Sequence, residues 1–219
     1  MPDILSTYVA LVPISVYFLL IGMMNMSRRP FVVSGTRDLS VLFLAISGMM
    51  IVGPVELFFP VGASWQFGIY VWVYVLVLYA LMVLLVLLGQ RSRINIYNIT
   101  MADFRAKLSD LAMELDAQAR WAGDALSLPG LGVSCYLEAN ELLANVSLVA
   151  CGSRQRPEGW RVLQNALTRT LHEGKTIESQ RHIGILFFIV GLVLFAVLHG
   201  MIWYYPMDFM RAIPDFLRV

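Results

Sequence analysis

Four long apolar stretches separate the polar parts of the chain, and each is long enough to form a membrane-spanning helix. They cover approximately residues 8–26, 39–59, 68–88 and 183–204. A hydrocarbon core of about 30 Å takes roughly 20 helical residues. The third stretch has no charged residue, and the fourth has only His199 as a titratable group. The pattern predicts an integral membrane α-helical protein with four transmembrane helices.

The segment between the third and fourth stretches has the mixed, charged sequence of a folded domain. Residues 94–100 alternate apolar and polar positions, as a strand with one buried face does. Thr100 and Asp103 then have the spacing of a helix N-cap, which predicts a helix over 101–119. Short runs rich in Val, Leu and Ser follow and predict two or three antiparallel strands.

A second helix is predicted to begin at Pro157, because proline suits the first turn of a helix. Its apolar positions recur at helical spacing and are Trp160, Leu163, Leu167 and Leu171. The order of elements predicts a small α+β domain, an antiparallel sheet with two helices, inserted between transmembrane helices 3 and 4.

The domain organisation follows from these changes in composition. Transmembrane helices 1–3 occupy 1–89, the α+β domain 90–182 and transmembrane helix 4 residues 183–204. The C-terminal tail, 205–219, alternates aromatic and charged residues between two prolines. Such a composition predicts a tail that lies at the membrane interface.

Basic residues fall on one side of the predicted spans only, apart from those in the C-terminal tail. Lys and Arg in short flanking loops are retained in the cytoplasm. The residues concerned are Arg28, Arg29, Arg37, Arg91, Arg93, Lys175 and Arg181. We therefore expect both termini outside and residues 90–182 in the cytoplasm, with the plasma (inner) membrane as the location. The N-terminus has no positive region before its apolar stretch, so a removable signal peptide is not expected.

Composition excludes an ordinary soluble protein and gives no support for nucleic-acid binding. Of the 219 residues, 58% are hydrophobic and 14% charged, against about 25% charged in soluble domains. A net charge of +1 offers no general attraction to nucleic acid. Cys135 and Cys151 lack the CxxC spacing of a zinc or redox site. No GxSxG or HExxH motif is present, so the sequence indicates no catalytic residue, metal or cofactor.

Glu56 and His199 are candidate partners within the membrane. Ionisable residues in a span are costly and therefore tend to face a partner or water. The predicted topology places both near the outer ends of their helices, where a contact is geometrically permitted. Such a contact could be a proton-titrating pair of a transporter, half of a metal site, or a structural hydrogen bond, and the structural hydrogen bond is favoured.

Arg154, Arg156 and Arg161 form the densest basic group in the predicted domain. They are candidates for contact with lipid head groups or with an acidic partner. A solvated loop explains the same residues equally well.

The sequence favours a non-enzymatic membrane scaffold or accessory subunit whose cytoplasmic α+β domain docks a protein partner. The expected partners are the bilayer and either other membrane-protein subunits or further copies of the chain. One alternative is a small transporter or channel subunit that uses Glu56 and His199. A second alternative is a membrane enzyme whose site is completed by a partner.

Overall fold

The computed structural model describes residues 4–27, 29–58, 70–140, 145–153, 155–173 and 181–217. It divides into two compact units, each drawn from separate parts of the sequence. The first unit holds the apolar helices. The second, called the sheet domain below, comprises Met23–Asp38 and Gln90–Ile185.

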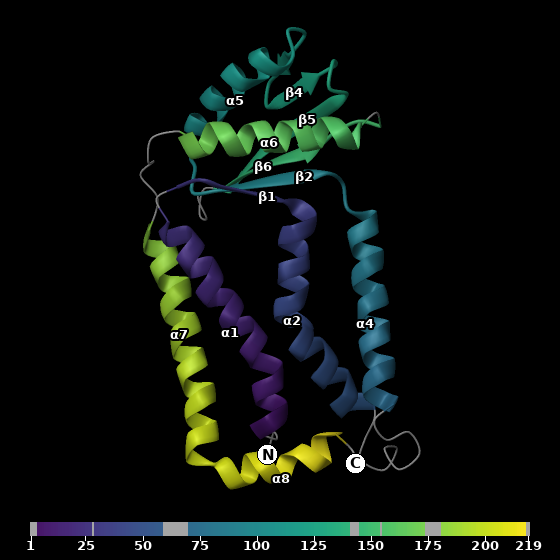
Figure 1. Ribbon diagram of the computed structural model, residues 1–219, viewed down its shortest axis with the longest axis vertical. Coiled ribbons are helices and arrows are strands. Elements are labelled where there is room, and N and C mark those ends of the chain that lie inside the picture. The colour runs from purple at the N-terminus through teal and green to yellow at the C-terminus, as the bar shows by residue number, and fades with distance from the viewer. Residues whose placement is uncertain are drawn as a thin grey trace. The chain divides into compact units, whose positions relative to one another are not determined.

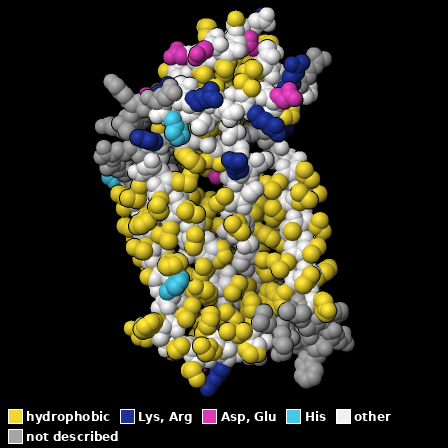
Figure 2. Space-filling model, viewed as in Figure 1, with side chains coloured by type: hydrophobic (Ala, Val, Ile, Leu, Met, Phe, Trp, Pro, Cys, Tyr) yellow, Lys and Arg dark blue, Asp and Glu magenta, His cyan; other side chains and the backbone are white. Residues whose placement is uncertain are grey.

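Four helices in the described part of the chain are long and apolar enough to cross a membrane, which confirms that prediction. They are α1 (Ile4–Met26), α2 (Gly35–Phe58), α4 (Tyr70–Gly89) and α7 (Arg181–Tyr204) (Figure 1). Hydrophobic side chains cover them on the face shown in Figure 2. In water such a surface would be unstable, whereas lipid solvates it.

Neighbouring helices of the first unit are held by close backbone approach and by hydrogen bonds. A Cβ atom at Gly22 of α1 would lie 2.6 Å from the backbone nitrogen of Phe188 on α7. A Cβ atom at Gly48 of α2 would lie even closer to the backbone of α1, at the carbonyl oxygen of Val9. The Tyr79 hydroxyl of α4 donates to the carbonyl of Phe43 on α2 at 2.5 Å. Small residues at such contacts let membrane helices pack tightly, and the contacts run in the order α7, α1, α2, α4.

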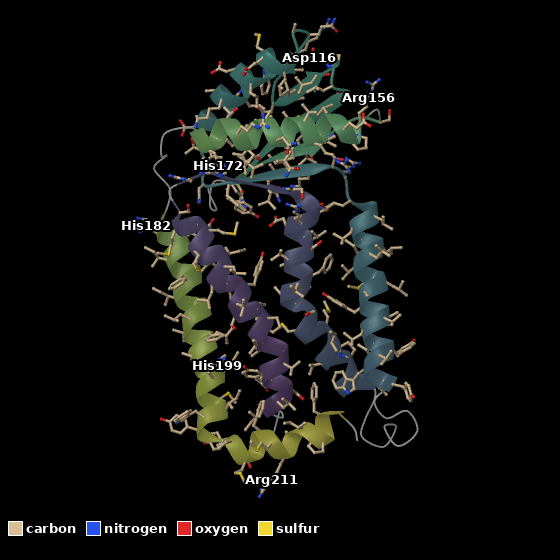
Figure 3. All side chains as sticks on the ribbon, in the orientation of Figure 1. Asp116, Arg156, His172, His182, His199 and Arg211 are labelled. Carbon is tan, nitrogen blue, oxygen red and sulfur yellow. The ribbon has the colours of Figure 1, made fainter. Side chains whose placement is uncertain are left out.

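The C-terminal segment forms a further helix, α8 (Pro206–Leu217), which a single residue separates from the end of α7. Its Phe209 packs edge-on against Tyr8 near the start of α1. Phe216 stacks on Trp72 near the start of α4, and its carbonyl accepts a hydrogen bond from the Trp72 indole at 3.1 Å. The helix therefore ties together the ends of two spans, and Figure 3 shows Arg211 pointing away from the other helices.

The sheet domain contains one antiparallel sheet of six strands in the order β1-β2-β6-β5-β4-β3. The strands are β1 (Phe31–Ser34), β2 (Arg93–Tyr97), β3 (Arg120–Ala122), β4 (Ala125–Leu128), β5 (Val133–Asn140) and β6 (Asn145–Ala150). An antiparallel sheet with helices is the predicted α+β architecture.

Strand β1 is the main departure from the predicted fold, because it lies between the first two spans, in a segment expected to be a loop. It pairs with β2 in a register that places Phe31 opposite Tyr97 and Ser34 opposite Ile94. Helix α2 begins at Gly35, directly after the strand. Two segments that are separated by two apolar helices thus build a single sheet.

Two helices, α5 (Met101–Leu115) and α6 (Pro157–Glu173), complete the sheet domain and bury its core against the sheet. Thr100 caps α5 as predicted, since its side chain accepts from the Asp103 backbone N–H. The predicted stripe of α6 is buried in the same core. Helix α5 ends at Leu115, short of the predicted residue 119, because Asp116 adopts extended backbone. Its carboxylate accepts instead from the backbone N–H groups of Gln118 and Gly130.

A second contact fastens the first loop to the sheet domain. Asn98, just after β2, has a backbone φ of 60°, a left-handed conformation that asparagine tolerates better than most residues. Its side-chain amide donates to the carbonyl of Met24 at 2.6 Å and to that of Arg29 at 3.4 Å. The last turn of α1 and the residue Arg29 that follows it are therefore both bound to the end of β2 before β1 begins.

Candidate functional site

A network of polar side chains lies on the face of the sheet opposite α5 and α6. Strand β2 alternates, so Ile94 and Ile96 enter the core while Arg93, Asn95 and Tyr97 share the other face. The Asn95 amide donates to the Asp38 carboxylate at 2.6 Å, and the Tyr97 hydroxyl donates to the same oxygen at 2.8 Å. Asp38 lies in the first turn of α2, where the helix dipole favours a negative charge.

The network continues from β2 into the next two strands of the sheet, β6 and β5. Arg93 donates from Nε to Asn95 at 2.9 Å and from Nη2 to the Ser147 hydroxyl of β6 at 2.9 Å. Ser147 donates in turn to Asn95 at 2.8 Å. The Arg93 guanidinium also lies 3.3 Å from the Glu138 carboxylate on β5. Asn95 and Ser147 are buried, and each has partners, so the arrangement cross-links three strands and the first turn of α2.

Removing the Asp38 carboxylate should destabilise the sheet domain more than removing an exposed one. Asp38→Ala leaves the buried Asn95 amide without its acceptor, which costs about 1–3 kcal/mol. Asp110 is exposed on α5, so Asp110→Ala serves as the matched control and should change stability by less than about 0.5 kcal/mol. Thermal unfolding of the purified protein measures both, and equal melting temperatures for the two variants would show that the network carries no stability.

The role of Asp38 was not predicted from the sequence. The available signal was an acidic residue in the first turn of a span, which is uncommon enough to suggest a partner. Its partners lie on β2, more than fifty residues away, and no local pattern points to them.

The proposed contact between Glu56 and His199 remains a prediction. The structure describes the backbone of Glu56 within α2, whereas its side chain lies outside the described residues. His199 lies on α7 (Figure 3), where its Nε2 is 3.3 Å from the Tyr8 hydroxyl of α1. Its Nδ1 is 2.9 Å from the carbonyl of Phe195, one turn earlier. The described contacts therefore join His199 to α1 as part of the packing of α1 against α7.

The arginines of the predicted basic group do not share one environment. Arg154 lies outside the described residues. The Arg156 backbone N–H donates to the carbonyl of Gly132 at 2.9 Å, and its side chain packs over that glycine. Gly132 has a φ of 63°, and a Cβ there would lie 2.7 Å from Arg156. Arg161 is exposed on α6, so its contact with a partner or lipid stays a prediction.

The outer edge of the sheet carries a second group of interacting side chains, which sequence reasoning did not identify. Arg105 of α5 lies 5.3 Å from the ring centre of Trp121 on β3. The same guanidinium is 2.7 Å from the Asp124 carboxylate and donates to the carbonyl of Gly123 at 2.7 Å. In the sheet order β3 is the last strand, so within the described residues its outer side pairs with no other strand.

Among the described residues, no group of three His, Cys, Asp or Glu side chains is placed to bind a metal ion. Cys135 is fully buried on β5, and Cys151 is half-buried just after β6. Burial, with a smaller contribution from nearby Cys151, raises the pKa of the Cys135 thiol to about 12. A thiol with that pKa is a poor nucleophile at neutral pH.

Cys135 should therefore resist alkylation in the native protein at pH 8.5, while Cys151 reacts. Because the folded protein holds the thiol proton more tightly than the unfolded chain does, the raised pKa contributes to stability. This contribution is complete at any pH below the unfolded thiol pKa of about 8.5. That contribution is lost as the pH rises from there toward about 12. Mass spectrometry after iodoacetamide treatment measures the modification of each cysteine. If Cys135 is modified as fast in the native protein as in the denatured protein, the prediction that its thiol is buried and unreactive is wrong.

No protein-family model matches the chain, and neither a curated protein nor a solved structure is similar to it. Its class therefore rests on its own architecture. Four helices long and apolar enough to cross a membrane, together with a separate antiparallel sheet with helices, indicate a membrane protein.

Proposed function

We propose that the protein is a non-enzymatic membrane subunit whose sheet domain lies in the cytoplasm and docks a protein partner in a larger membrane complex. The concentration of basic residues in the loops that form the sheet domain supports the cytoplasmic side. The pairing of β1 with β2 supports a common side for both loops.

The observation that carries the docking function is the outer side of β3 beside Arg105 and Trp121, which no strand of the described residues pairs with. An unpaired strand edge offers backbone N–H and C=O groups to an incoming strand, and many domains bind partners in this way. Arginine and tryptophan are also the residue types enriched at the energetic centres of protein interfaces. We propose that an extended segment of a partner protein pairs with β3 and contacts these two side chains.

Site-specific photo-crosslinking in membranes of the cells that produce the protein tests this proposal. A benzoylphenylalanine at Ala122, which is exposed on β3, should give one discrete adduct, whereas the same probe at Arg169 on α6 should not. Arg105→Ala removes the contacts with Trp121 and Asp124 and should abolish the adduct. The matched charge control, Arg161→Ala, should leave it intact. An adduct from Arg169 alone, or one that Arg105→Ala does not change, would contradict docking at β3.

Thiol labelling in sealed cells tests the orientation separately. Cys151 should be protected from a membrane-impermeant maleimide until lysis, because the sheet domain is proposed to be cytoplasmic. A cysteine in place of Met210, which is 66% exposed on α8, should react before lysis. The reverse pattern would invert the proposed topology.

A further inference from the structure

The pairing of β1 with β2 brings together basic residues from the ends of two different spans. Ser34 lies opposite Ile94, and a Cβ atom at Gly35 would lie 2.8 Å from the Cβ of Arg93. Arg37 is two residues beyond Gly35 in α2, and Arg91 is two residues before Arg93. In the sequence these arginines are more than fifty residues apart, whereas in the sheet domain they belong to adjoining segments.

The arginines differ in whether their charge is neutralised. Arg93 pairs with Glu138 at 3.3 Å. In the described part of the chain the other ion pair of an arginine is that of Arg105, so Arg37 and Arg91 have no carboxylate partner there. Both side chains are exposed. Asp38, the acidic residue beside Arg37, already accepts hydrogen bonds from Asn95 and Tyr97.

The charges of both Arg91 and Arg93 act on the phenol of Tyr136. Partial burial and the hydrogen bond to Glu138 raise the pKa of Tyr136, while the positive charges of Arg91 and Arg93 act to lower it.

The positions of Arg37 and Arg91 along the chain place them at the depth of lipid head groups. Arg37 is the third residue of α2, and Arg91 is the second residue after α4 ends at Gly89. Both helices are candidate membrane spans, and their ends meet the phosphate region of a bilayer. A guanidinium group matches the geometry of a phosphate with two parallel hydrogen bonds.

We propose that Arg37, in the first turn of α2, and Arg91, just after α4, together bind the phosphate of one anionic phospholipid. Anionic lipids concentrate in the cytoplasmic leaflet and attract basic residues near a span. The lipid would supply the negative charge that the described carboxylates do not provide. This inference uses neither the β3 edge nor a protein partner, so it stands or falls independently of the proposed docking function.

Titration of the full-length protein in mild detergent with short-chain lipids tests the site. Dioctanoyl phosphatidylglycerol should bind saturably, as measured by native mass spectrometry, and at least tenfold more tightly than dioctanoyl phosphatidylcholine. Arg37→Gln with Arg91→Gln should weaken phosphatidylglycerol binding by about thirtyfold and leave phosphatidylcholine binding unchanged. Arg161→Gln with Arg169→Gln removes the same charge from α6 and should have no such effect.

Two further measurements distinguish loss of the site from loss of the fold, and a lipid ligand from free phosphate. Arg37→Lys with Arg91→Lys retains the charge but not the paired hydrogen bonds, and should restore part of the binding, which separates loss of the site from loss of the fold. Inorganic phosphate at the same concentrations should give no saturable binding. Saturable phosphate binding that the double Gln variant removes would overturn the lipid assignment. Unchanged phosphatidylglycerol affinity in the double Gln variant, or equal loss in the α6 control, would overturn the site.

Discussion

Replacing Trp160 with alanine is expected to lower the free energy of unfolding of the sheet domain by about 3–5 kcal/mol. The indole is 6% exposed, in the core that α6 forms with the sheet. Its Nε1–H donates to the Gln155 side chain at 2.9 Å, and Gln155 donates in turn to the carbonyl of Ser134 at 2.8 Å. The variant therefore loses apolar burial and also one end of a hydrogen-bonded chain that joins α6 to β5.

A loss of that size is decisive because a domain has only about 5–15 kcal/mol of stability in total. Thermal unfolding, followed by circular dichroism or by exposure of the buried Cys135 thiol, measures the effect. Trp203→Ala is the matched control, since Trp203 is 84% exposed at the end of α7 and its removal should leave the sheet domain unchanged. An unaltered melting profile for Trp160→Ala would place the α6 stripe outside the core.

Replacing Gly22 with leucine should separate α1 from α7. A Cβ atom at Gly22 would lie 2.6 Å from the backbone of Phe188, and one at Gly191 would lie 2.8 Å from the backbone nitrogen of Leu19. Backbone atoms cannot rotate away, so the helices must move apart along the whole contact. Overpacking of this kind costs typically 1–3 kcal/mol and sometimes more. Loss of monodisperse protein in detergent and a lower melting temperature are the expected readouts.

Gly200 on α7 provides the control for this substitution. A Cβ at Gly200 would meet nothing within 4 Å, so Gly200→Leu adds the same apolar side chain without a clash. Both substitutions raise helix propensity similarly, which leaves the helix contact as the difference between them. Equal behaviour of the two leucine variants would show that α1 and α7 do not pack through Gly22.

The elements that could be predicted from the sequence are those whose signal is local. A run of some twenty apolar residues identifies a span by itself. The α6 stripe and the Thr100 cap are likewise complete within a few turns of chain. Gly184 and Gly191 of the last span face α1 at close range, and small residues at helical spacing are a local signal of close helix packing.

The elements that could not be predicted depend on partners far away in the sequence. Strand β1 has four residues, too few for a period of two to show, and its pairing with β2 crosses two spans. The end of α5 depends on Asp116, whose carboxylate binds Gly130 across a turn. The β3 edge is three residues long, and its contact with Arg105 comes from packing of α5 beside the sheet.

Disulfide formation between β1 and β2 tests the central claim most directly, that two loops separated by two spans form one sheet on one side of the membrane. Phe31 lies opposite Tyr97, so cysteines at these positions have Cβ atoms about 4.5–5.5 Å apart. In a background with Cys151→Ser, mild oxidation of the full-length protein should link them in high yield, as peptide mapping detects. The offset pair Phe31→Cys with Ser92→Cys, about 17 Å apart along the ladder, should not link. Failure of the 31–97 pair to form a disulfide, or equal yield from the offset pair, would contradict the shared sheet.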